Sequence, residues 1–365
     1  MAIGIGGAGS KLAYQLDPES AIVNVSDSEL RKVPATRRIL AAVHSERGQM
    51  RGSRKDPQIG RDAYLSVRGE LLRLAEGELV ITSSGGGSGN GITTGLLEEL
   101  SARDLIHQAD KTSFAIILPY PKLEPAEFVD NTIAFLQGPV SDAIDSGNTG
   151  NIYLFSNQLK YESRMTEAAY NQAIIDTLKQ FFAIPRKGDA LKLLDGHIDY
   201  EDFSLYCAKP YFNHFTYFDF DPETGFGDQF KAHLNPCLLP PETPIEALFL
   251  LEVPPGGKVT AFYDILEYFA AQNVTPVFGV VENPERSTPF VTVSVLYSRK
   301  PAELVEDFNR ISHEHTQARV RKSLEQHIPL PKLEVSLEKE TKQAGLKRGA
   351  DDDEILTVLR RLGKL

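Results

Sequence analysis

Two glycine-rich segments are the residues of this sequence best suited to hold phosphate groups. One reads Gly4-Ile5-Gly6-Gly7-Ala8-Gly9, and the other runs from Ser83 to Gly91 as SSGGGSGNG. Each follows an apolar run typical of a strand and precedes a helical pattern. Residues without a β-carbon let backbone N–H groups approach phosphate oxygens, and the helix N-terminus adds partial positive charge. We therefore expect a nucleotide site whose phosphate-binding residues are Gly6, Gly7, Ala8, Gly9, Ser10, Lys11, Gly85, Gly86, Gly87, Ser88, Gly89, Asn90 and Gly91.

The two segments differ in how specific they are. The first fits a tight turn or a dinucleotide site as well as a mononucleotide site. The second has five glycines among nine residues, and packing alone rarely needs so many given the entropic cost of glycine. A mobile surface loop is its alternative explanation. No Gly-Lys-Ser/Thr follows, which excludes a P-loop.

A pair of carboxylates is the other candidate for chemistry. Asp199 and Asp202 lie in the segment HIDYEDF, which starts at His197. Carboxylates three residues apart can face one side of a helix start, where they can orient water and hold Mg²⁺ or a monovalent ion through it. Hydrolysis of a phosphoanhydride needs such an oriented water and a cation to offset phosphate charge. The alternative is a structural role as a helix cap with acidic first-turn residues.

The elements around these residues predict an α/β fold with a parallel, Rossmann-like sheet covered on both faces. In the first half, strands alternate with helices. The expected strands are 2–5, 21–25, 78–82, 113–118 and 151–155, and the expected helices are 10–16, 58–75, 92–105 and 126–143. A long helix over 165–182 follows. The second half reads as a smaller α+β domain, with strands at 211–220, 247–253, 275–281 and 290–297 and helices at 259–271 and 301–324.

We divide the chain into four parts on this pattern. A nucleotide-binding domain spans 1–163, the central helix and the acidic loop span 164–203, and the α+β domain spans 204–333. A charged linker and an amphipathic tail complete the chain over 334–365.

Composition narrows the classes of function. The formal net charge of −11 argues against a broad nucleic-acid surface. The two cysteines make neither a disulfide framework nor a zinc site. No apolar run reaches the roughly 18 residues of a membrane span, and the N-terminus lacks the features of a signal peptide. We expect a cytoplasmic protein.

The motifs together resemble those of the tubulin/FtsZ superfamily, and its prokaryotic FtsZ-like and TubZ-like members in particular. GGGSGNG at 85–91 is similar to the family's signature loop GGGTGTG or GGGTGSG, and GIGGAGSKLA at 4–13 resembles the FtsZ first loop GVGGAGGNAV. Lys11 stands where the family has Asn, and could add charge near the phosphates or point to solvent. HIDYED resembles the synergy loop NxDxxD, with His197 in place of Asn.

The resemblance implies further site residues. Asn24 matches the second loop, Gly52 begins a stretch to Gly60 similar to the third loop around the γ-phosphate, and Asn157 lies in a segment like the one near the ribose. Asn171 falls where the central helix presents Asn or Asp to the guanine edge. Glu124 and Glu127 are candidates for contacts with the ribose. The implied cofactors are GTP or GDP with Mg²⁺, and no residue is assigned as a direct metal ligand.

The implied function is a GTP-dependent polymerising protein, a GTPase that forms head-to-tail filaments. In this family the synergy loop completes the nucleotide site of the next subunit, which would make Asp199 and Asp202 catalytic there. Two alternatives stay open. One is a tubulin-like adaptor that binds nucleotide without hydrolysis, favoured by Asn90 and His197. The other is a Rossmann oxidoreductase, which lacks a ribose acid beside Asn24 and leaves the second glycine segment unexplained.

The tail 351–365, DDDEILTVLRRLGKL, resembles the FtsZ C-terminal peptide. It has an apolar stripe at helical spacing, acids before the stripe and basic residues at its end, which suits the helix dipole. We expect it to dock on an adaptor or a membrane-anchoring protein. The alternatives are a contact with its own body or with the next subunit, and a disordered end.

Overall fold

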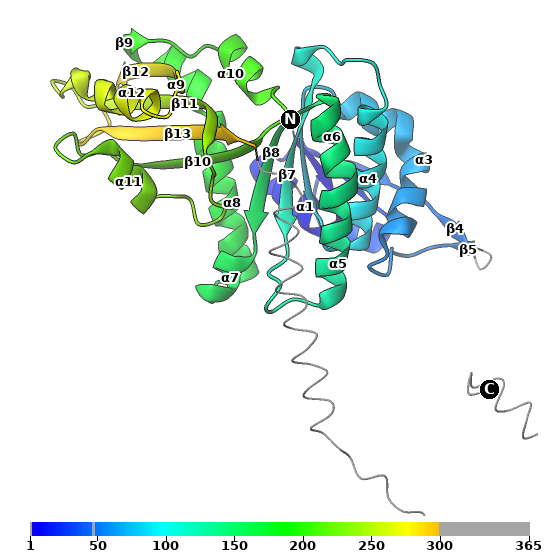
Figure 1. Ribbon diagram of the computed structural model, residues 1–365. Coiled ribbons are helices and arrows are strands. Elements are labelled where there is room, and N and C mark those ends of the chain that lie inside the picture. The colour runs from blue at the N-terminus through cyan, green and yellow to red at the C-terminus, as the bar shows by residue number, and fades with distance from the viewer. Residues whose placement is uncertain (1, 46–47, 299–365) are drawn as a thin grey trace, which may run out of the picture. The chain divides into compact units, whose positions relative to one another are not determined.

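The computed structural model describes residues 2–45 and 48–298 (Figure 1). The helix expected at 301–324, the linker and the tail 351–365 lie outside these residues.

The first half of the chain forms six parallel strands in the spatial order β3-β2-β1-β6-β7-β8. Their bounds are Ala2–Ile5 (β1), Ala21–Asn24 (β2), Arg37–Leu40 (β3), Leu79–Ser83 (β6), Thr112–Leu118 (β7) and Thr149–Ser156 (β8); the hairpin of β4 (His44–Ser45) and β5 (Gly48–Gln49) stands apart. Counted in chain order within the sheet, this is 3-2-1-4-5-6. Ligands of such sheets bind outside the carboxyl ends of the strands where the order reverses, here between β1 and β6.

Helices cover both faces of this sheet, as expected for an α/β fold. In β7, Phe114 and Ile116 face a core shared with one helical layer, while Ala115 and Ile117 face the other layer. On the first side lie α3 (Pro57–Ala75), α4 (Gly87–Ser101), α5 (Ala126–Phe135) and α6 (Ser141–Ser146), seen on the right of Figure 1. On the second lie α1 (Gly6–Leu16) and α8 (Glu167–Phe182).

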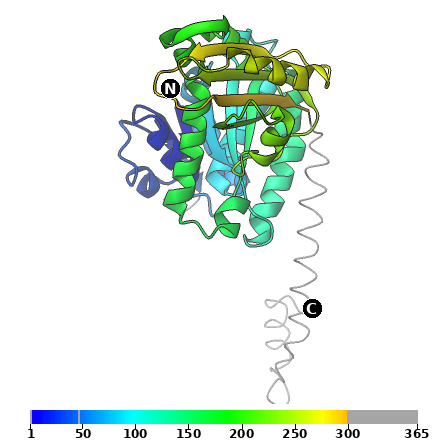
Figure 2. The same ribbon diagram turned by 90° about the vertical axis from the view of Figure 1, so that its left-hand side faces the viewer.

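The central helix α8 packs against both halves of the chain. Its buried residues Ile174, Leu178 and Phe181 share a core with Tyr153 of the first half and Phe215 of the second. The second half continues the sheet as β10-β13-β11-β12-β9, antiparallel except for β11 with β12, and joins it by one pairing of Phe212 with Ile152. In the turned view its yellow strands lie above the cyan strands of the first half (Figure 2).

The remaining elements have the following bounds. The strands are Lys192–Gly196 (β9), Phe212–Asp219 (β10), Pro244–Val253 (β11), Val277–Glu282 (β12) and Phe290–Tyr297 (β13). The helices are Asp27–Leu30 (α2), Gln158–Glu162 (α7), Ile184–Ala190 (α9), Tyr200–Cys207 (α10), Phe226–Ala232 (α11) and Phe262–Ala270 (α12). Short 3₁₀ turns cover Gln108–Asp110 and Val259–Ala261, and a π turn covers Leu136–Val140.

Three expectations about elements need correction. The helix α1 begins at Gly6 and α4 at Gly87, so both glycine segments reach into their helices instead of ending before them. The single helix expected at 126–143 is two helices joined by the π turn containing Pro139, because proline has no N–H for the helix ladder. The strand β9, inside the region assigned to the central helix and acidic loop, pairs with β12 at the edge of the second half.

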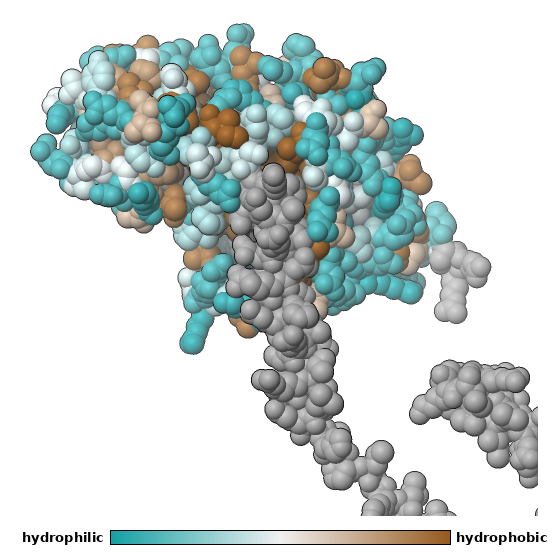
Figure 3. Space-filling model, viewed as in Figure 1, coloured by the Kyte–Doolittle hydropathy of each residue, from teal (hydrophilic) through white to brown (hydrophobic). Residues whose placement is uncertain are grey.

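Exposed apolar side chains are scattered over the surface. On the face shown in Figure 3 they form small groups among hydrophilic residues. Leu123, Tyr200 and Leu205 belong to this exposed set. Across the described residues no helix combines the length and apolar character needed to cross a membrane.

Candidate nucleotide-binding site

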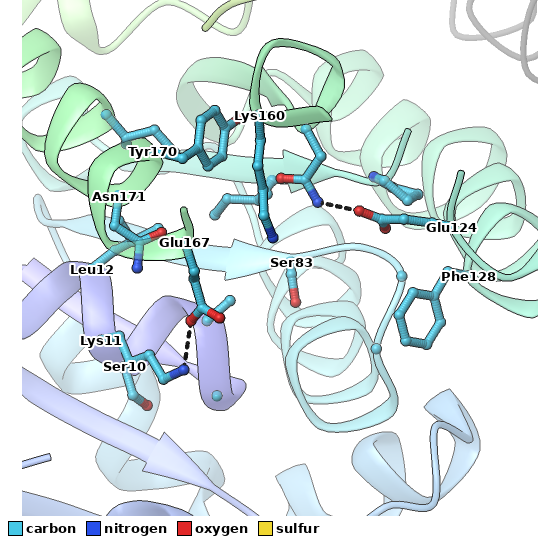
Figure 4. A pocket seen from close by; sticks show the side chains of 18 of the residues that line it. Ser10, Lys11, Leu12, Ser83, Glu124, Phe128, Lys160, Glu167, Tyr170 and Asn171 are labelled. Carbon is cyan, nitrogen blue, oxygen red and sulfur yellow. Dashed lines mark hydrogen bonds and ion pairs between the residues drawn. The ribbon is translucent and has the colours of Figure 1, made fainter. Parts of the chain in front are cut away.

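A cavity of about 530 Å³ lies where the strand order reverses. Its walls come from the start of α1, from α2, from the turn between β6 and α4, from the segment after β7, and from α7 and α8. Figure 4 shows side chains from these elements converging on one space. The cavity therefore occupies the position that the strand order predicts for a ligand.

The two glycine segments meet at the floor of the cavity. Gly6 has a positive φ of 75°, a conformation that favours glycine. A β-carbon at Gly6 would lie 2.8 Å from the backbone of Gly89. The turn after β1 thus packs directly against the first turn of α4, which brings two helix N-termini to one place. The N–H groups of a helix's first turn have no partner within the helix and can bind an anion.

Among the predicted phosphate-binding residues, six line the cavity and seven lie behind it or beside it. The six are Gly7, Ala8, Ser10, Lys11, Gly85 and Gly86. A β-carbon at Gly86 would have only Ser83 Oγ within 4 Å, at 3.8 Å. Gly86 is also the N-cap of α4, which leaves the backbone open to a ligand at this point.

The glycines behind the cavity serve close packing. A β-carbon added to Gly9 would lie 2.1 Å from the carbonyl oxygen of Ile81. One added to Gly87 would lie 2.6 Å from Ser53 Oγ, and one added to Gly91 would lie 1.9 Å from the carbonyl oxygen of Pro57. Gly89 is closed by the carbonyl oxygen of Ser83. Packing therefore accounts for Gly87, Gly89 and Gly91 of the second segment and leaves Gly86 open at the cavity.

The polar residues of the second segment also contact protein. The Ser88 hydroxyl donates to Ser53 Oγ at 3.0 Å. The Asn90 amide donates to the carbonyl oxygens of Ser84 at 2.6 Å and Asn131 at 3.0 Å, and Asn90 is buried. Asn90 therefore fixes the turn to α5, and its difference from the family's Thr or Ser has a local structural explanation.

The third predicted segment packs beside the second. Gly60 lies against Gly87, because a β-carbon there would be 2.3 Å from the Gly87 carbonyl oxygen. Arg54 and Lys55 both have positive φ, a strained conformation for residues with side chains. The Lys55 ammonium lies 5.0 Å from the ring centre of Phe128, which lines the cavity. Gly52 has no neighbour within 4 Å of an added β-carbon and does not line the cavity.

Asn24 is a positioning residue in the structure. Its buried side chain donates to Glu29 Oε2 at 2.7 Å and accepts from the Ser26 backbone N–H. Glu29 lines the cavity beside the first turn, 3.2 Å from the position of a β-carbon on Gly7. No motif in the sequence marks Glu29 as a cavity residue.

The far wall of the cavity holds three residues named from the sequence, Asn157, Asn171 and Glu124. The Asn157 amide donates to Glu124 Oε1 at 2.7 Å. Burial raises the pKa of Glu124, and the hydrogen bonds from Asn157 and Tyr161 oppose that rise. Glu127 does not line the cavity.

Positive charge at the cavity comes from Lys11, Lys32 and Lys160. Lys11 forms an ion pair with Glu167 and its side chain is about half exposed, so it does not stand alone beside the phosphate turns. Within residues 2–45 and 48–298, Lys32 and Lys160 form no ion pair, which leaves them available to an anion. Neither was predicted, because nothing in the sequence places 32 or 160 beside the glycines.

The acidic pair lies away from this cavity. Asp199 is the N-cap of α10, and its carboxylate accepts from the Asp202 backbone N–H at 2.7 Å. Asp202 is exposed in the first turn of the same helix. His197 lies 3.4 Å from Asp189. The capping alternative is thus observed for Asp199, whereas the Asp202 carboxylate has no capping role.

A second cavity of about 770 Å³ marks the other end of the sheet. It is lined by Ala2, Leu79 and Ser113, near the amino ends of β1, β6 and β7, and by Tyr200 and Phe203 of α10. It is larger than the first, yet it contains neither glycine turn. Of these two cavities, the smaller one therefore holds the residues that the sequence predicts for phosphate binding.

The fold can be compared with known structures. A GTPγS-form protofilament of TubZ from Bacillus thuringiensis serovar israelensis has a TM-score of 0.67 at 12% identity, covering 89% of this chain and 92% of that one. The chain has the tubulin/FtsZ fold. This confirms the fold expected from the resemblance.

Two further structures share the tubulin/FtsZ fold with this chain. An empty FtsZ dimer from M. jannaschii has a TM-score of 0.60 at 16% identity, covering 81% of this chain and 87% of that one. A GTPγS-bound protofilament of CetZ2 from Haloferax volcanii has a TM-score of 0.62 at 17% identity, with coverage of 87% and 98%. No protein-family model and no curated protein matches the sequence. The likeness therefore lies in the fold.

Proposed function

We propose that this chain binds GTP, polymerises head to tail and hydrolyses GTP where subunits meet. In this proposal, the carboxylates of Asp199 and Asp202 complete the nucleotide site of the adjacent subunit. The observation that carries it is the position of the two sets of residues. The phosphate-binding cavity opens at the carboxyl ends of the parallel strands, and α10 lies at their amino ends.

The distance between these ends argues for action between subunits. β7 has seven residues, with Ile117 at the first cavity and Ser113 at the second. At about 3.3 Å per residue, the strand separates its ends by roughly 20 Å. Carboxylates at one end cannot orient a water on phosphates at the other end of the same chain. Head-to-tail stacking brings the two ends together across a contact.

Exposed apolar residues at both ends support such a contact. Leu123 follows β7 at the nucleotide end and is 62% exposed, while Tyr200 on α10 is 60% exposed. Two different complementary surfaces generate an open, head-to-tail assembly. Several structures with this fold are protofilaments or a two-stranded filament.

The cavity suits a nucleotide with Mg²⁺. The two helix N-termini, Lys32 and Lys160 favour phosphates. Glu29 adds a negative charge at the same end, where it would repel phosphate directly. A cation between the carboxylate and the phosphates resolves this conflict, and Mg²⁺ binds through one or two carboxylates plus phosphate oxygens. Mg²⁺ would supply charge neutralisation during phosphate release.

One observation favours the second candidate, an adaptor that binds GTP without hydrolysis. The Asp199 carboxylate already accepts the Asp202 backbone N–H, so it has less capacity left to orient water. In this case Asp199 stabilises α10, and the filament would not turn over nucleotide.

The deciding experiment measures phosphate release from GTP at increasing protein concentration, together with GTP affinity. A polymerising GTPase releases phosphate with specific activity that rises with concentration. Binding without release assigns the adaptor function. Absence of nucleotide binding contradicts both candidates.

Asp202→Ala is the informative variant, and Glu201→Ala is its matched control. Both are exposed acids in the first turn of α10. Successive helix residues point about 100° apart, so the control removes the same charge from the same turn in another direction. We expect Asp202→Ala to abolish turnover with GTP affinity unchanged, and Glu201→Ala to retain most activity. Equal loss in both variants would contradict a specific role for Asp202.

The tail 351–365 remains our candidate for docking on an adaptor or a membrane-anchoring protein. Deleting residues 350–365 should leave GTP turnover and polymerisation intact and remove localisation in the cell. Failure of polymerisation would instead assign the tail to a contact between subunits.

A further inference from the structure

The cavity at the amino ends of the strands has the size and lining of a site for a small organic molecule. Its volume is about 770 Å³, and ligand pockets in proteins span roughly 300–1,000 Å³ and are mostly apolar. Apolar side chains from α1, β6, α8 and α10 line it, namely Leu16, Leu79, Phe182, Tyr200 and Phe203. None of the residues that the sequence predicts for nucleotide binding lines this cavity, so the proposed nucleotide binding leaves it unused.

An unpaired ammonium group gives this cavity its chemical preference. Lys111, the residue before β7, lines the cavity and is half-buried. Within residues 2–45 and 48–298, its side chain forms no hydrogen bond or ion pair. Burial lowers the pKa of Lys111, because the charged form loses solvation and no carboxylate compensates for it. A half-buried cation without a counter-charge costs free energy, which an anion bound in the cavity recovers.

Two further cations lie at the same cavity. Lys179 in the last turn of α8 and Arg186 in α9 both line it and are exposed, and neither forms an ion pair within the described part of the chain. Asp17 and Glu78 also line the cavity, so three cations face two carboxylates. One Asp17 oxygen accepts the backbone N–H of Glu19 at 3.0 Å. An excess of positive charge beside apolar surface favours a ligand that is both anionic and apolar.

We infer that this cavity binds a small amphipathic anion, a molecule with an apolar body and a single carboxylate. The carboxylate contacts the Lys111 ammonium, and the apolar body lies along Phe182 and Phe203. Hydrogen bonds between two charged groups are shorter and stronger than neutral ones, so Lys111 sets the preference for an anion. The two cavities share no lining residue, so this binding does not depend on the proposed nucleotide binding.

The ligand also acts on the proposed head-to-tail assembly. Tyr200 lines this cavity, and it is 60% exposed at the end that meets the next subunit in that proposal. A bound ligand and a neighbouring subunit then compete for the same end of the molecule. By linkage, each lowers the affinity of the protein for the other. This consequence alone rests on the proposed function.

Titration of the full chain with octanoate and with 1-octanol measures what the carboxylate adds, because the two probes have the same hydrocarbon chain. We expect wild type to bind octanoate about tenfold more tightly than 1-octanol, the scale of one hydrogen bond to a charged group. Lys111→Met should lose this preference and keep its affinity for 1-octanol, since Met retains the apolar length. Lys111→Arg, which keeps the charge, should retain the preference. Lys32→Met is the control, because it removes a cation from the nucleotide cavity instead.

The binding outcomes decide the ligand site. Loss of the octanoate preference in Lys111→Met, with retention in Lys111→Arg and Lys32→Met, supports it. Absence of octanoate binding, or equal affinity of wild type for octanoate and 1-octanol, overturns it. An equal loss in Lys32→Met and Lys111→Met also overturns it, because octanoate would then bind in the nucleotide cavity.

Sedimentation of polymer formed with GTP tests the effect on assembly. At a free octanoate concentration of about ten times its Kd, mass action predicts that the protein concentration needed for assembly rises about tenfold in wild type. In Lys111→Met, the same octanoate concentration should raise it much less. An unchanged value in wild type overturns the competition between ligand and subunit. Failure to assemble without octanoate contradicts the proposed function instead, and the binding titrations still decide the ligand site.

Discussion

The two ends of the parallel sheet differ in which groups they present, backbone groups at one end and side chains at the other. At the carboxyl ends, the backbone conformation at Gly6 and Gly86 brings two helix N-termini to one cavity. At the amino ends, α10 presents side chains, and Asp202 in its first turn is exposed. In the proposed function, the first end holds the nucleotide, and the second end acts on a nucleotide held by the adjacent subunit. The proposed coupling of nucleotide binding to assembly depends on this difference between the two ends.

Mixing two inactive variants tests the difference between the ends most strongly. Asp202→Ala disables the α10 end, and Gly86→Val fills the space next to the cavity with a side chain. Each alone should lose at least about 100-fold in turnover, the scale of removing a group that positions or activates the reacting water. In a random equal mixture, about a quarter of the head-to-tail contacts join two intact ends, so turnover should return to about that fraction of wild type.

The control mixes the Asp202→Ala variant with a chain that carries both Asp202→Ala and Gly86→Val. That mixture contains no contact with two intact ends and should stay inactive. If the first mixture also stays inactive while both variants still co-assemble, the carboxylates do not act on the neighbouring subunit's nucleotide.

A second comparison concerns glycines at the nucleotide end alone. Gly91→Ala places a β-carbon 1.9 Å from the carbonyl oxygen of Pro57, whereas Gly86→Ala places one 3.8 Å from Ser83 Oγ. Overpacking of this kind costs typically 1–3 kcal/mol, so we expect Gly91→Ala to lose about 3 kcal/mol of unfolding free energy. The unfolding free energy of Gly86→Ala should stay within about 0.5 kcal/mol of the wild-type value, because the added β-carbon meets no close atom.

Denaturant unfolding without nucleotide measures both free energies. The GTP affinity of folded Gly86→Ala should then fall. Gly91→Ala should bind less GTP only because a smaller fraction of the protein is folded. Equal stability of the two variants would contradict the distinction between cavity glycines and packing glycines.

The sequence predicted the fold well because its signals are local. The apolar run before Gly4 and the run before Ser83 mark β1 and β6, and the glycines after them mark the phosphate turns. The sequence could not separate Gly86 from Gly91, because their difference lies in residues 57–61, which pack against Gly91 and not against Gly86. It missed Glu29, Lys32 and Glu167 for the same reason: they are ordinary charged residues until the fold brings them to the cavity.

The smallest effect that we predict is a difference in unfolding free energy between variants of Asp199 and Asp202. Asp199 caps this helix through the Asp202 backbone N–H, while the Asp202 side chain has no such role. Loss of an N-cap costs typically about 1 kcal/mol, so Asp199→Ala should lower the unfolding free energy by about that amount. Asp202→Ala should lower it slightly, by about 0.3 kcal/mol, through the lost interaction of an acid with the helix dipole. Asp199→Asn, which retains a capping side chain without the charge, should recover most of the lost stability. Its turnover then decides what Asp199 does: restored stability without turnover assigns the charge to catalysis, and recovery of both assigns Asp199 to the helix cap alone.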